Sequence, residues 1–342
     1  MATLSDQYVD KGDLARLRRW KAQESSEAVH FATTLDGWKI AVTQYSSGGA
    51  KNHPVLLCHG LGANRWSFDT EPDVSLTQHL VKQGYDVFAA DLRGHGRSEK
   101  PATSDKKWGW GFNDYCHQDL DAAIDVVLET TGKKQLHYIG HSMGGLLLLA
   151  RAALQDIRIK SAMTLGSTLD YSDSPSIFHQ LIKIKPLGKF LPIIPVHWVS
   201  AASSLGAKFT VKAIDPVLVN PSNVNRALYR KMAAIALHPV SGKVMMDLAQ
   251  AIDGTGLKSI DGSIYADRLK QQGYGFPVLS VAGSADIQCP PVAAARFGTE
   301  HIVFGQAFGQ QKDYGHDDLI MGKNARTETW PVYVDWLEKH EK

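Results

Sequence analysis

Three polar side chains, Ser142, Asp286 and His316, could together perform nucleophilic catalysis. Serine is a weak nucleophile at neutral pH, and it needs a base to take its proton and a third group to orient that base. Ser142 is the centre of a Gly-His-Ser-Met-Gly peptide at residues 140–144. Because an apolar run precedes this peptide and a helix-forming run follows it, the sequence predicts a sharp strand-to-helix turn that presents the hydroxyl to a cleft. The alternative is a Ser/Gly-rich turn without chemistry.

The base and the acid are predicted from their places after late strands. His316 lies between the last expected strand and the last helix, which distinguishes it among the 14 histidines. Asp286 directly follows the expected strand at residues 277–282, at the carboxyl end where open α/β sheets bind ligands. Asp170, which follows an earlier strand, is the alternative acid. The chain order Ser, Asp, His is the order expected with this type of serine turn.

Attack on a carbonyl group also requires donors that stabilise the negative oxygen. Each preorganised N–H donor at that point contributes about 3–4 kcal/mol. The N–H of Met143, at the start of the helix after Ser142, is one expected donor. The second is the N–H of Leu61, in a His-Gly-Leu-Gly segment at residues 59–62 whose glycines let the backbone approach closely. His141 is expected to point away from its neighbour Ser142 and not to serve it.

The elements that must position these residues form an alternating pattern of strands and helices. Short apolar runs alternate with helical spacing, which predicts a mostly parallel central sheet flanked by helices on both faces, an α/β class. The expected strands are residues 29–33, 38–44, 54–58, 85–90, 136–140, 159–165, 277–282 and 301–304. The expected helices are residues 75–83, 114–130, 143–155 and 327–339.

The pattern divides the chain into three parts. Residues 1–28 are a polar extension that is expected to be helical, and residues 29–167 together with 273–342 form the α/β core. In residues 168–272 the strand–helix alternation stops, which predicts an inserted helical cap. This range also contains seven prolines, at positions 175, 186, 192, 195, 216, 221 and 239.

The cap contains an apolar stretch at residues 186–198 that could hold an acyl chain or an apolar ring system above the cleft. The alternative is that it only packs the cap onto the sheet. The candidate substrate-binding residues are Phe190 and Trp198 from this stretch, together with Trp66 and Trp110. Packing in the core or in loops is the competing interpretation for the last two.

Composition narrows the class of protein further. The chain has 342 residues, of which 44% are hydrophobic and 21% charged, enough to bury a full core. A net charge of +2 without a long basic run gives no indication of a nucleic-acid partner. Three cysteines form no disulfide framework and favour a reducing compartment. Because no signal peptide and no run of ~20 apolar residues is present, we expect a cytoplasmic protein without a transmembrane segment.

The sequence carries no local signature of a cofactor. It has no His-Glu-x-x-His or paired Cys-x-x-Cys spacing, so no metal is expected. Its glycine-rich loops fit neither a nucleotide-phosphate nor a dinucleotide pattern. The expectation is therefore an enzyme without a cofactor, and the sequence leaves its oligomeric state open.

Across residues 29–339 the chain resembles the α/β-hydrolase superfamily. The resemblance is carried by residues 56–62, 84–87, 91–98 and 140–145 and by the loops of Asp286 and His316. Within the superfamily, the chain is similar to the acid-lipase-like and polyester-synthase-like branches. This similarity rests on Glu-Thr-Thr-Gly at 129–132, an aromatic run at 108–112 and Tyr-Gly-His-Asp-Asp-Leu at 314–319.

The resemblance implies an α/β-hydrolase fold and a carboxylic ester hydrolase of the esterase or lipase type, acting on a small apolar substrate through an acyl-enzyme. Polyester synthases of this kind carry cysteine in place of Ser142, which favours hydrolysis over polymerisation. Dehalogenases and epoxide hydrolases use an aspartate nucleophile, so the serine argues against both. Other reactions of the same triad stay open: C–C bond hydrolysis, thioester hydrolysis, cofactor-free haloperoxidation and acyl transfer. A non-catalytic ligand-binding protein on the same scaffold is the alternative from another class.

Overall fold

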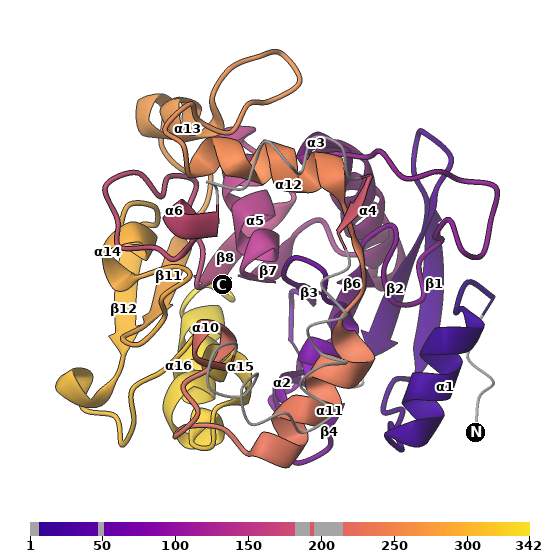
Figure 1. The fold of residues 1–342 in the computed structure, drawn as a ribbon, viewed down its shortest axis with the longest axis horizontal. Coiled ribbons are helices and arrows are strands. Elements are labelled where there is room, and N and C mark those ends of the chain that lie inside the picture. Colours follow the sequence, from indigo (N-terminus) through magenta and orange to yellow (C-terminus); the bar gives the residue numbers. More distant parts are fainter. Residues whose placement is uncertain (1–6, 47–50, 182–191, 195–214) are drawn as a thin grey trace.

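An eight-stranded sheet forms the centre of the computed structural model, which describes residues 7–46, 51–181, 192–194 and 215–342. The strand order is β1-β2-β6-β3-β7-β8-β11-β12, with β12 at the left edge and β1 at the right in Figure 1. β1 and β2 are antiparallel to their neighbours, and the other six strands run parallel. The strands are β1 (Ala28–Thr33), β2 (Lys39–Tyr45), β3 (Val55–Cys58), β6 (Val87–Asp91), β7 (Leu136–His141), β8 (Ile159–Leu165), β11 (Val278–Gly283) and β12 (Glu300–Phe304).

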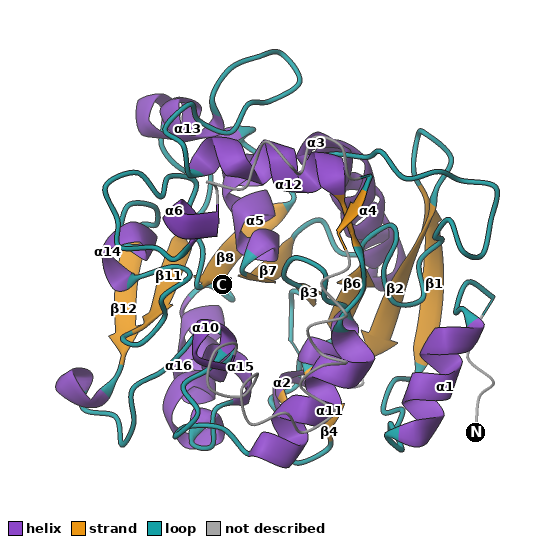
Figure 2. Ribbon diagram, viewed as in Figure 1, coloured by secondary structure: helices purple, strands orange, loops and turns teal. Residues whose placement is uncertain are grey.

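Helices cover both faces of this sheet (Figure 2). The helices are α1 (Lys11–Arg19), α2 (Leu76–Lys82), α3 (Phe112–Asp114), α4 (Leu120–Thr131), α5 (Met143–Ala153), α6 (Phe178–Leu181), α10 (Asp215–Leu218), α11 (Arg226–Ala236), α12 (Gly242–Leu248), α13 (Tyr265–Gln272), α14 (Pro291–Ala294), α15 (Asp318–Met321) and α16 (Ala325–Lys339). Four short strands lie outside the main sheet: β4 (Asp69–Glu71), β5 (Val74–Ser75), β9 (Ile193–Ile194) and β10 (Val240–Ser241). Among the described residues, no helix combines the length and the hydropathy that a membrane span requires.

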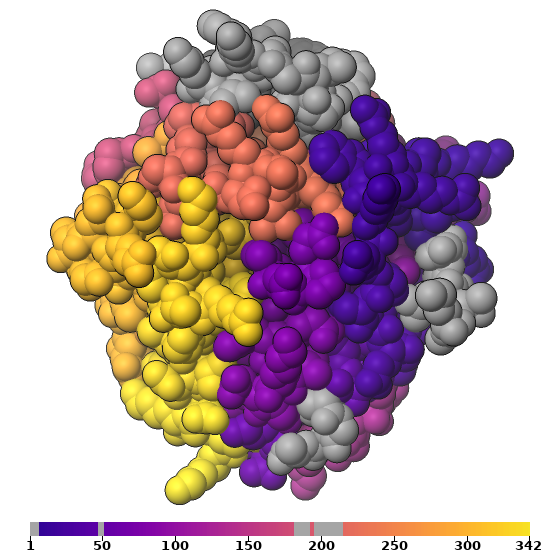
Figure 3. Space-filling model, turned by 90° about the horizontal axis from the view of Figure 1, so that it is seen from below, coloured from indigo at the N-terminus to yellow at the C-terminus, as the bar shows by residue number. Residues whose placement is uncertain are grey.

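Successive side chains along each strand point to opposite faces of the sheet, so the core around it consists of two clusters. In β3, Val55 and Leu57 belong to the cluster beneath α2 and α16, whereas Leu56 and Cys58 belong to the cluster beneath α4 and α5. This follows from the two-residue period of a strand. Both faces are buried, which explains why the strands read as short, nearly continuous apolar runs. The view in Figure 3 shows the C-terminal segment against segments from the first third of the chain, and α16 indeed packs on α2.

The predicted α/β class, a mostly parallel sheet covered on both faces, is confirmed. Each expected strand forms, and no strand end differs from its prediction by more than two residues. The expected helix at residues 114–130 is real, but it contains a π-helical turn at Tyr115–Asp119 before α4 begins. The polar N-terminal extension does contain a helix, α1, which packs on α11.

Among the described residues of the range expected to form the cap, 168–272, the helix α13 packs on the core. α13 lies against α5, and its Tyr265 and Leu269 are buried in the same cluster as the strand residues. It therefore behaves as a core helix, because its apolar face fills the layer above the sheet. The division of the chain into core and cap stays a prediction.

Candidate active site

Ser142 occupies the turn between β7 and α5, with φ 52° and ψ −119°. A positive φ is uncommon for any residue with a side chain and persists only where the surroundings hold it. Here the backbone of Ser142 is held on both sides. Its N–H donates to the carbonyl oxygen of Leu165 at 2.9 Å, and its own carbonyl oxygen accepts from Ser167 Oγ at 2.8 Å. The turn is thus fixed through the backbone, and the half-buried side chain stays available.

Two glycines allow the chain to pass very close to this turn. A Cβ on Gly144 would lie 2.2 Å from the carbonyl oxygen of Cys58, so only glycine lets α5 start directly under the end of β3. A Cβ on Gly60 would lie 3.0 Å from the Cβ of Ser142. The loop that follows β3 therefore lies immediately beside the serine, as the predicted oxyanion hole requires.

Asp286 and His316 form a buried pair. The Nδ1–H of His316 donates to Asp286 Oδ2 at 2.7 Å. The other carboxylate oxygen accepts from the backbone N–H groups of Gln288 and Cys289, each at 2.9 Å. Because three donors fix the carboxylate, it in turn fixes the imidazole. The pairing keeps the proton on Nδ1 and leaves Nε2 as an acceptor, which is the form that a general base needs.

The electrostatics of this pair favour a charged imidazole more than usual. Burial lowers the pKa of His316, but the negative charge of Asp286 and the hydrogen bond to it act in the opposite direction and outweigh burial. The pKa of His316 is consequently raised above its ordinary value of 6.5. A base with a raised pKa accepts the serine proton more readily and titrates closer to neutral pH.

Ser142 and His316 flank the same short loop. Ser142 is bonded to Leu165 and Ser167, and the residue between them, Gly166, would bring a Cβ within 2.9 Å of His316 Nδ1. His316 Nε2 is buried and has no hydrogen-bond partner in the described part of the chain. The serine–histidine hydrogen bond is therefore not formed here. Such bonds are often long in unliganded enzymes and tighten when substrate binds.

The two N–H groups expected to form the oxyanion hole are both available. Met143 is the first residue of α5, and the first N–H groups of a helix have no acceptor within it. Within the residues described, neither Met143 nor Leu61 donates a backbone hydrogen bond to any other group. Leu61 follows Gly60, which lies against Ser142. The arrangement can hold a substrate carbonyl between the start of α5 and the loop after β3.

Two supporting residues were not found from the sequence. His141 Nε2 lies 3.2 Å from the carbonyl oxygen of His316, and the two rings are 4.8 Å apart, so His141 packs on the base and not on the serine. The carboxylate of Asp318 accepts from the N–H of Gly315 at 2.9 Å, and burial raises the pKa of Asp318 to about 7. Both hold the backbone on either side of His316. No local motif marks such contacts, because they depend on the fold.

Asp170, the alternative acid, is not in contact with the base. It pairs with Arg296 at 3.2 Å, and its Oδ1 accepts from the N–H of Ser172 at 2.9 Å. Its side chain is partly exposed on the loop after β8. The acid that touches His316 is therefore Asp286.

The candidate substrate-binding residues fall into two groups. Trp66 is buried against α11, with the Arg65 guanidinium 4.2 Å from its ring. Trp110 is buried too, stacked on Trp108 and donating through Nε1 to Tyr115 Oη at 2.8 Å. These surroundings favour the packing interpretation for both. The other two candidates, Phe190 and Trp198, lie outside the described residues.

Comparisons with known proteins agree with the fold. A sequence model described as "alpha/beta hydrolase fold" matches residues 53–190. Mouse lipase member N is 23% identical over 346 residues, which cover 90% of this chain and 86% of that protein. The poly(3-hydroxyalkanoate) polymerase subunit PhaC of Haloferax mediterranei is 20% identical over 332 residues, covering 89% and 63%. A thermophilic esterase structure from Thermogutta terrifontis aligns with a TM-score of 0.58 at 21% identity, covering 92% and 99%.

The sheet order, the serine turn and the matched family model together define the fold, because all three belong to one architecture. The chain has the α/β-hydrolase fold. Its similar proteins include lipases and a poly(3-hydroxyalkanoate) polymerase subunit. The resemblance identified from the sequence motifs is thereby confirmed.

Proposed function

We propose that this protein hydrolyses carboxylic esters of small molecules, with Ser142 as nucleophile, His316 as general base and Asp286 as the group that orients it. The observation that carries the proposal is the buried His316 imidazole, whose Nδ1 is held by Asp286 while its Nε2 has no partner in the described structure. The imidazole lies beside the loop that holds Ser142 in its turn. Lipases and esterases among the similar proteins support the same reaction.

In the first half of the reaction, Nε2 of His316 takes the hydroxyl proton as Ser142 Oγ attacks the ester carbonyl carbon. The carbonyl oxygen becomes negative and is stabilised by the N–H groups of Leu61 and Met143. The C–O bond to the alcohol then breaks, and His316 returns the proton to the leaving alkoxide oxygen. Asp286 stabilises the imidazolium in between, without taking the proton itself. The product is an acyl group on Ser142.

In the second half, water replaces the alcohol. Nε2 of His316 takes a proton from the water as its oxygen attacks the acyl carbon, and the same two N–H groups stabilise the second oxyanion. The bond to Ser142 Oγ breaks, and the serine recovers its proton from His316. The acid leaves, and the enzyme returns to its starting state.

Hydrolysis of p-nitrophenyl esters from acetate to palmitate tests the proposed function. We expect turnover with a clear optimum of acyl length, because an apolar acyl pocket gains free energy with each buried CH₂ until the pocket is full. A fluorophosphonate probe should label the wild type on Ser142. If no ester is turned over while the probe still labels the serine, the nucleophile serves another reaction and ester hydrolysis is wrong.

The pH dependence of kcat/KM should report the His316–Asp286 pair. His316 acts as a base only when it is neutral, so activity is lost as the pH falls through its pKa in the free enzyme. Because Asp286 raises that pKa, the acid limb should have its midpoint above the ordinary histidine value of 6.5. The measurement is kcat/KM for one ester across the pH range in which the protein remains folded. A midpoint well below 6.5 would contradict the pairing as the source of the acid limb.

Acyl transfer to an alcohol is the second candidate function, favoured by the similarity to a polyester polymerase subunit over most of the chain. The acyl-enzyme would form as above, and an alcohol oxygen would attack it in place of water. Product analysis with added alcohol separates the two reactions. Free acid as the dominant product at moderate alcohol concentrations supports hydrolysis, whereas a new ester as the dominant product supports transfer.

The state of the cysteines is related to the redox conditions of the compartment in which the protein is found. Cys58, Cys116 and Cys289 are all free and buried. Structural disulfides are typical of oxidising compartments and rare in reducing ones. We therefore retain the cytoplasm as the proposed location.

A further inference from the structure

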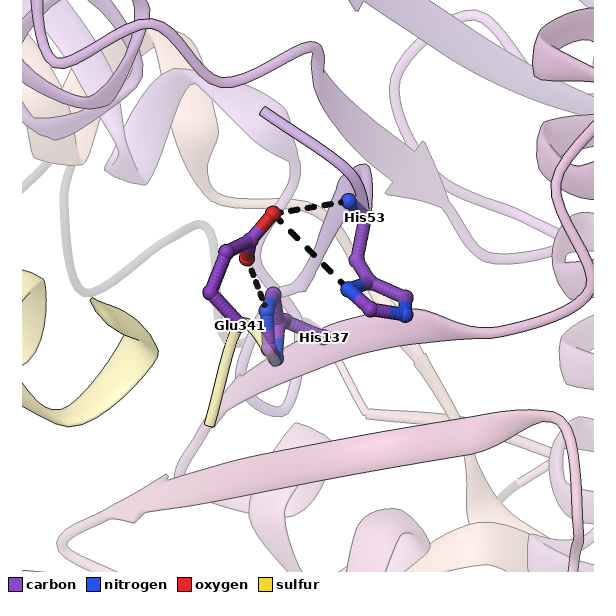
Figure 4. A group of neighbouring side chains, drawn as sticks. All are labelled: His53, His137 and Glu341. Carbon is purple, nitrogen blue, oxygen red and sulfur yellow. Dashed lines mark hydrogen bonds and ion pairs between the residues drawn. The ribbon is translucent and has the colours of Figure 1, made fainter. Parts of the chain in front are cut away.

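Two histidines and a glutamate form a cluster (Figure 4). It lies at the starts of β3 and β7, whereas Ser142 follows the end of β7. His53 comes just before β3, His137 is the second residue of β7, and Glu341 follows α16. One ligand atom from each of the three side chains lies within 4.8 Å of the other two. The cluster is therefore assembled by the fold from three parts of the chain that are far apart in sequence.

Glu341 is the centre of the cluster. Its Oε2 lies 2.9 Å from His137 Nε2, and its Oε1 lies 3.8 Å from His53 Nδ1. The backbone N–H groups of Asn52 and His53 donate to Oε1. The carboxylate thus faces both imidazoles, as Figure 4 shows, and the two backbone donors fix its position.

Each imidazole has the features of a metal ligand. His137 is fully buried, and its Nδ1 is bonded to Ser161 Oγ at 2.8 Å, so the ring is oriented with Nε2 toward the cluster. Metal-binding histidines are oriented in this way through their second nitrogen. His53 Nδ1 is buried and has no hydrogen-bond partner among the described residues.

The ion pair between His137 and Glu341 does not give every buried polar atom of this cluster a hydrogen bond. It leaves His53 Nδ1 buried and without a hydrogen bond among the described residues, which costs free energy. A second buried polar atom without a hydrogen bond belongs to Tyr85, whose ring packs on that of His137. The Tyr85 hydroxyl has no hydrogen-bond partner among the described residues. Unsatisfied buried polar atoms in a native structure call for an unseen partner such as an ion or water.

We propose that His53 Nδ1, His137 Nε2 and the Glu341 carboxylate bind one zinc ion, with water as the fourth ligand. Two histidines and a glutamate are a donor set that zinc accepts in tetrahedral sites. Zinc–ligand bonds of about 2.0–2.1 Å place tetrahedral ligand atoms about 3.4 Å apart. The separations at Glu341 are 2.9 Å at Oε2 and 3.8 Å at Oε1, and one ligand atom of each residue lies within 4.8 Å of the other two. Side-chain rotations that bring one carboxylate oxygen to both imidazoles would complete the site.

The ion has a structural role and does not serve the reaction at Ser142. His137 lies near the start of β7 and Ser142 directly follows its end, and five residues of extended chain span about 16 Å. The ion would instead connect the starts of β3 and β7 to the segment after α16. Because the three ligands come together only in the folded chain, binding stabilises the folded state. The inference goes beyond the proposed function and is independent of it.

Calorimetric titration of the metal-depleted full-length chain with zinc chloride tests the site. We expect one ion per chain in the wild type and a higher midpoint of thermal unfolding when zinc is present. Glu341→Gln and His53→Ala should each weaken binding by at least about 100-fold, since loss of an outer partner alone costs 10–100-fold. The matched controls are Glu338→Gln and His340→Ala, which remove the same chemical groups next to the site and should bind zinc like the wild type.

Two results would overturn the proposal. One is a wild type that is folded by circular dichroism but shows no saturable one-to-one zinc binding. The other is a double variant, His53→Ala with Glu341→Gln, that binds zinc as tightly as the wild type, which would place the ion at another histidine. Ester turnover is measured in parallel in the chelated wild type, where we expect it to persist. Failure of the metal site thus remains distinguishable from failure of the proposed function.

Discussion

Ser142→Ala should abolish ester turnover, with a loss of kcat of about a million-fold. The hydroxyl is the only atom that can form the acyl-enzyme in the proposed reaction, so no other group at the site substitutes for it. The fold should survive, because the turn is held by the backbone of Ser142 through Leu165 and Ser167 and not through its hydroxyl. The measurement is kcat with the best p-nitrophenyl ester, together with the thermal unfolding midpoint of both proteins.

A second serine, on another loop at the carboxyl ends of the parallel strands, provides the control. Ser172, on the loop after β8, donates its hydroxyl to Asp170 and makes no contact with His316. Ser172→Ala should retain wild-type kcat and fluorophosphonate labelling, whereas Ser142→Ala should lose both. Turnover by Ser142→Ala within tenfold of the wild type would remove the serine from the reaction and, with it, the proposed function.

The strands of the central sheet could be predicted from the sequence because each corresponds to a local pattern of residues. Short apolar runs such as Ile159–Leu165, bounded by polar turns, need no tertiary information to be recognised. The serine turn is local too, since a strand, a Gly-x-Ser-x-Gly peptide and a helix are contiguous. The π-helical turn at Tyr115–Asp119 was not predicted, because its apolar spacing is indistinguishable from that of an ordinary helix.

The supporting contacts of the site could not be predicted in this way. His141 contacts the carbonyl of a residue 175 positions away, and Gly166 is required because the Asp286–His316 pair lies against it. Such roles follow from which loops meet at the carboxyl edge of the sheet. The same reason applies to His53, His137 and Glu341, whose spacing matches no metal motif but whose side chains converge after folding.

Two tryptophans that the sequence suggested as substrate-binding residues are buried by packing. Trp66 and Trp110 lie near the motif loops and were natural candidates for the substrate pocket. In the structure both are buried, one beneath α11 and the other in a stack with Trp108. A large aromatic side chain near a site is stabilised by burial whether or not a ligand is present, so proximity in sequence does not assign it to the pocket.

Asp286→Asn should lower kcat by about ten-thousand-fold, as expected when a catalytic histidine loses its orienting carboxylate. An asparagine amide can present its NH₂ to Nδ1, which then has to accept, so the imidazole proton moves to Nε2 and the base can no longer take the serine proton. The negative charge that raises the pKa of His316 is also lost. The residual acid limb of kcat/KM should consequently move to lower pH.

Asp170→Asn is the matched control for this substitution. Asp170 is an aspartate on the same edge of the sheet, yet it pairs with Arg296 and not with His316. It should therefore retain kcat within a few-fold of the wild type and leave the acid limb unchanged. The two variants separate the two possible acids, since only the residue that holds the imidazole affects both rate and pH profile. A severe loss of kcat in Asp170→Asn with a mild loss in Asp286→Asn would show that the buried pair in this structure is not the catalytic one.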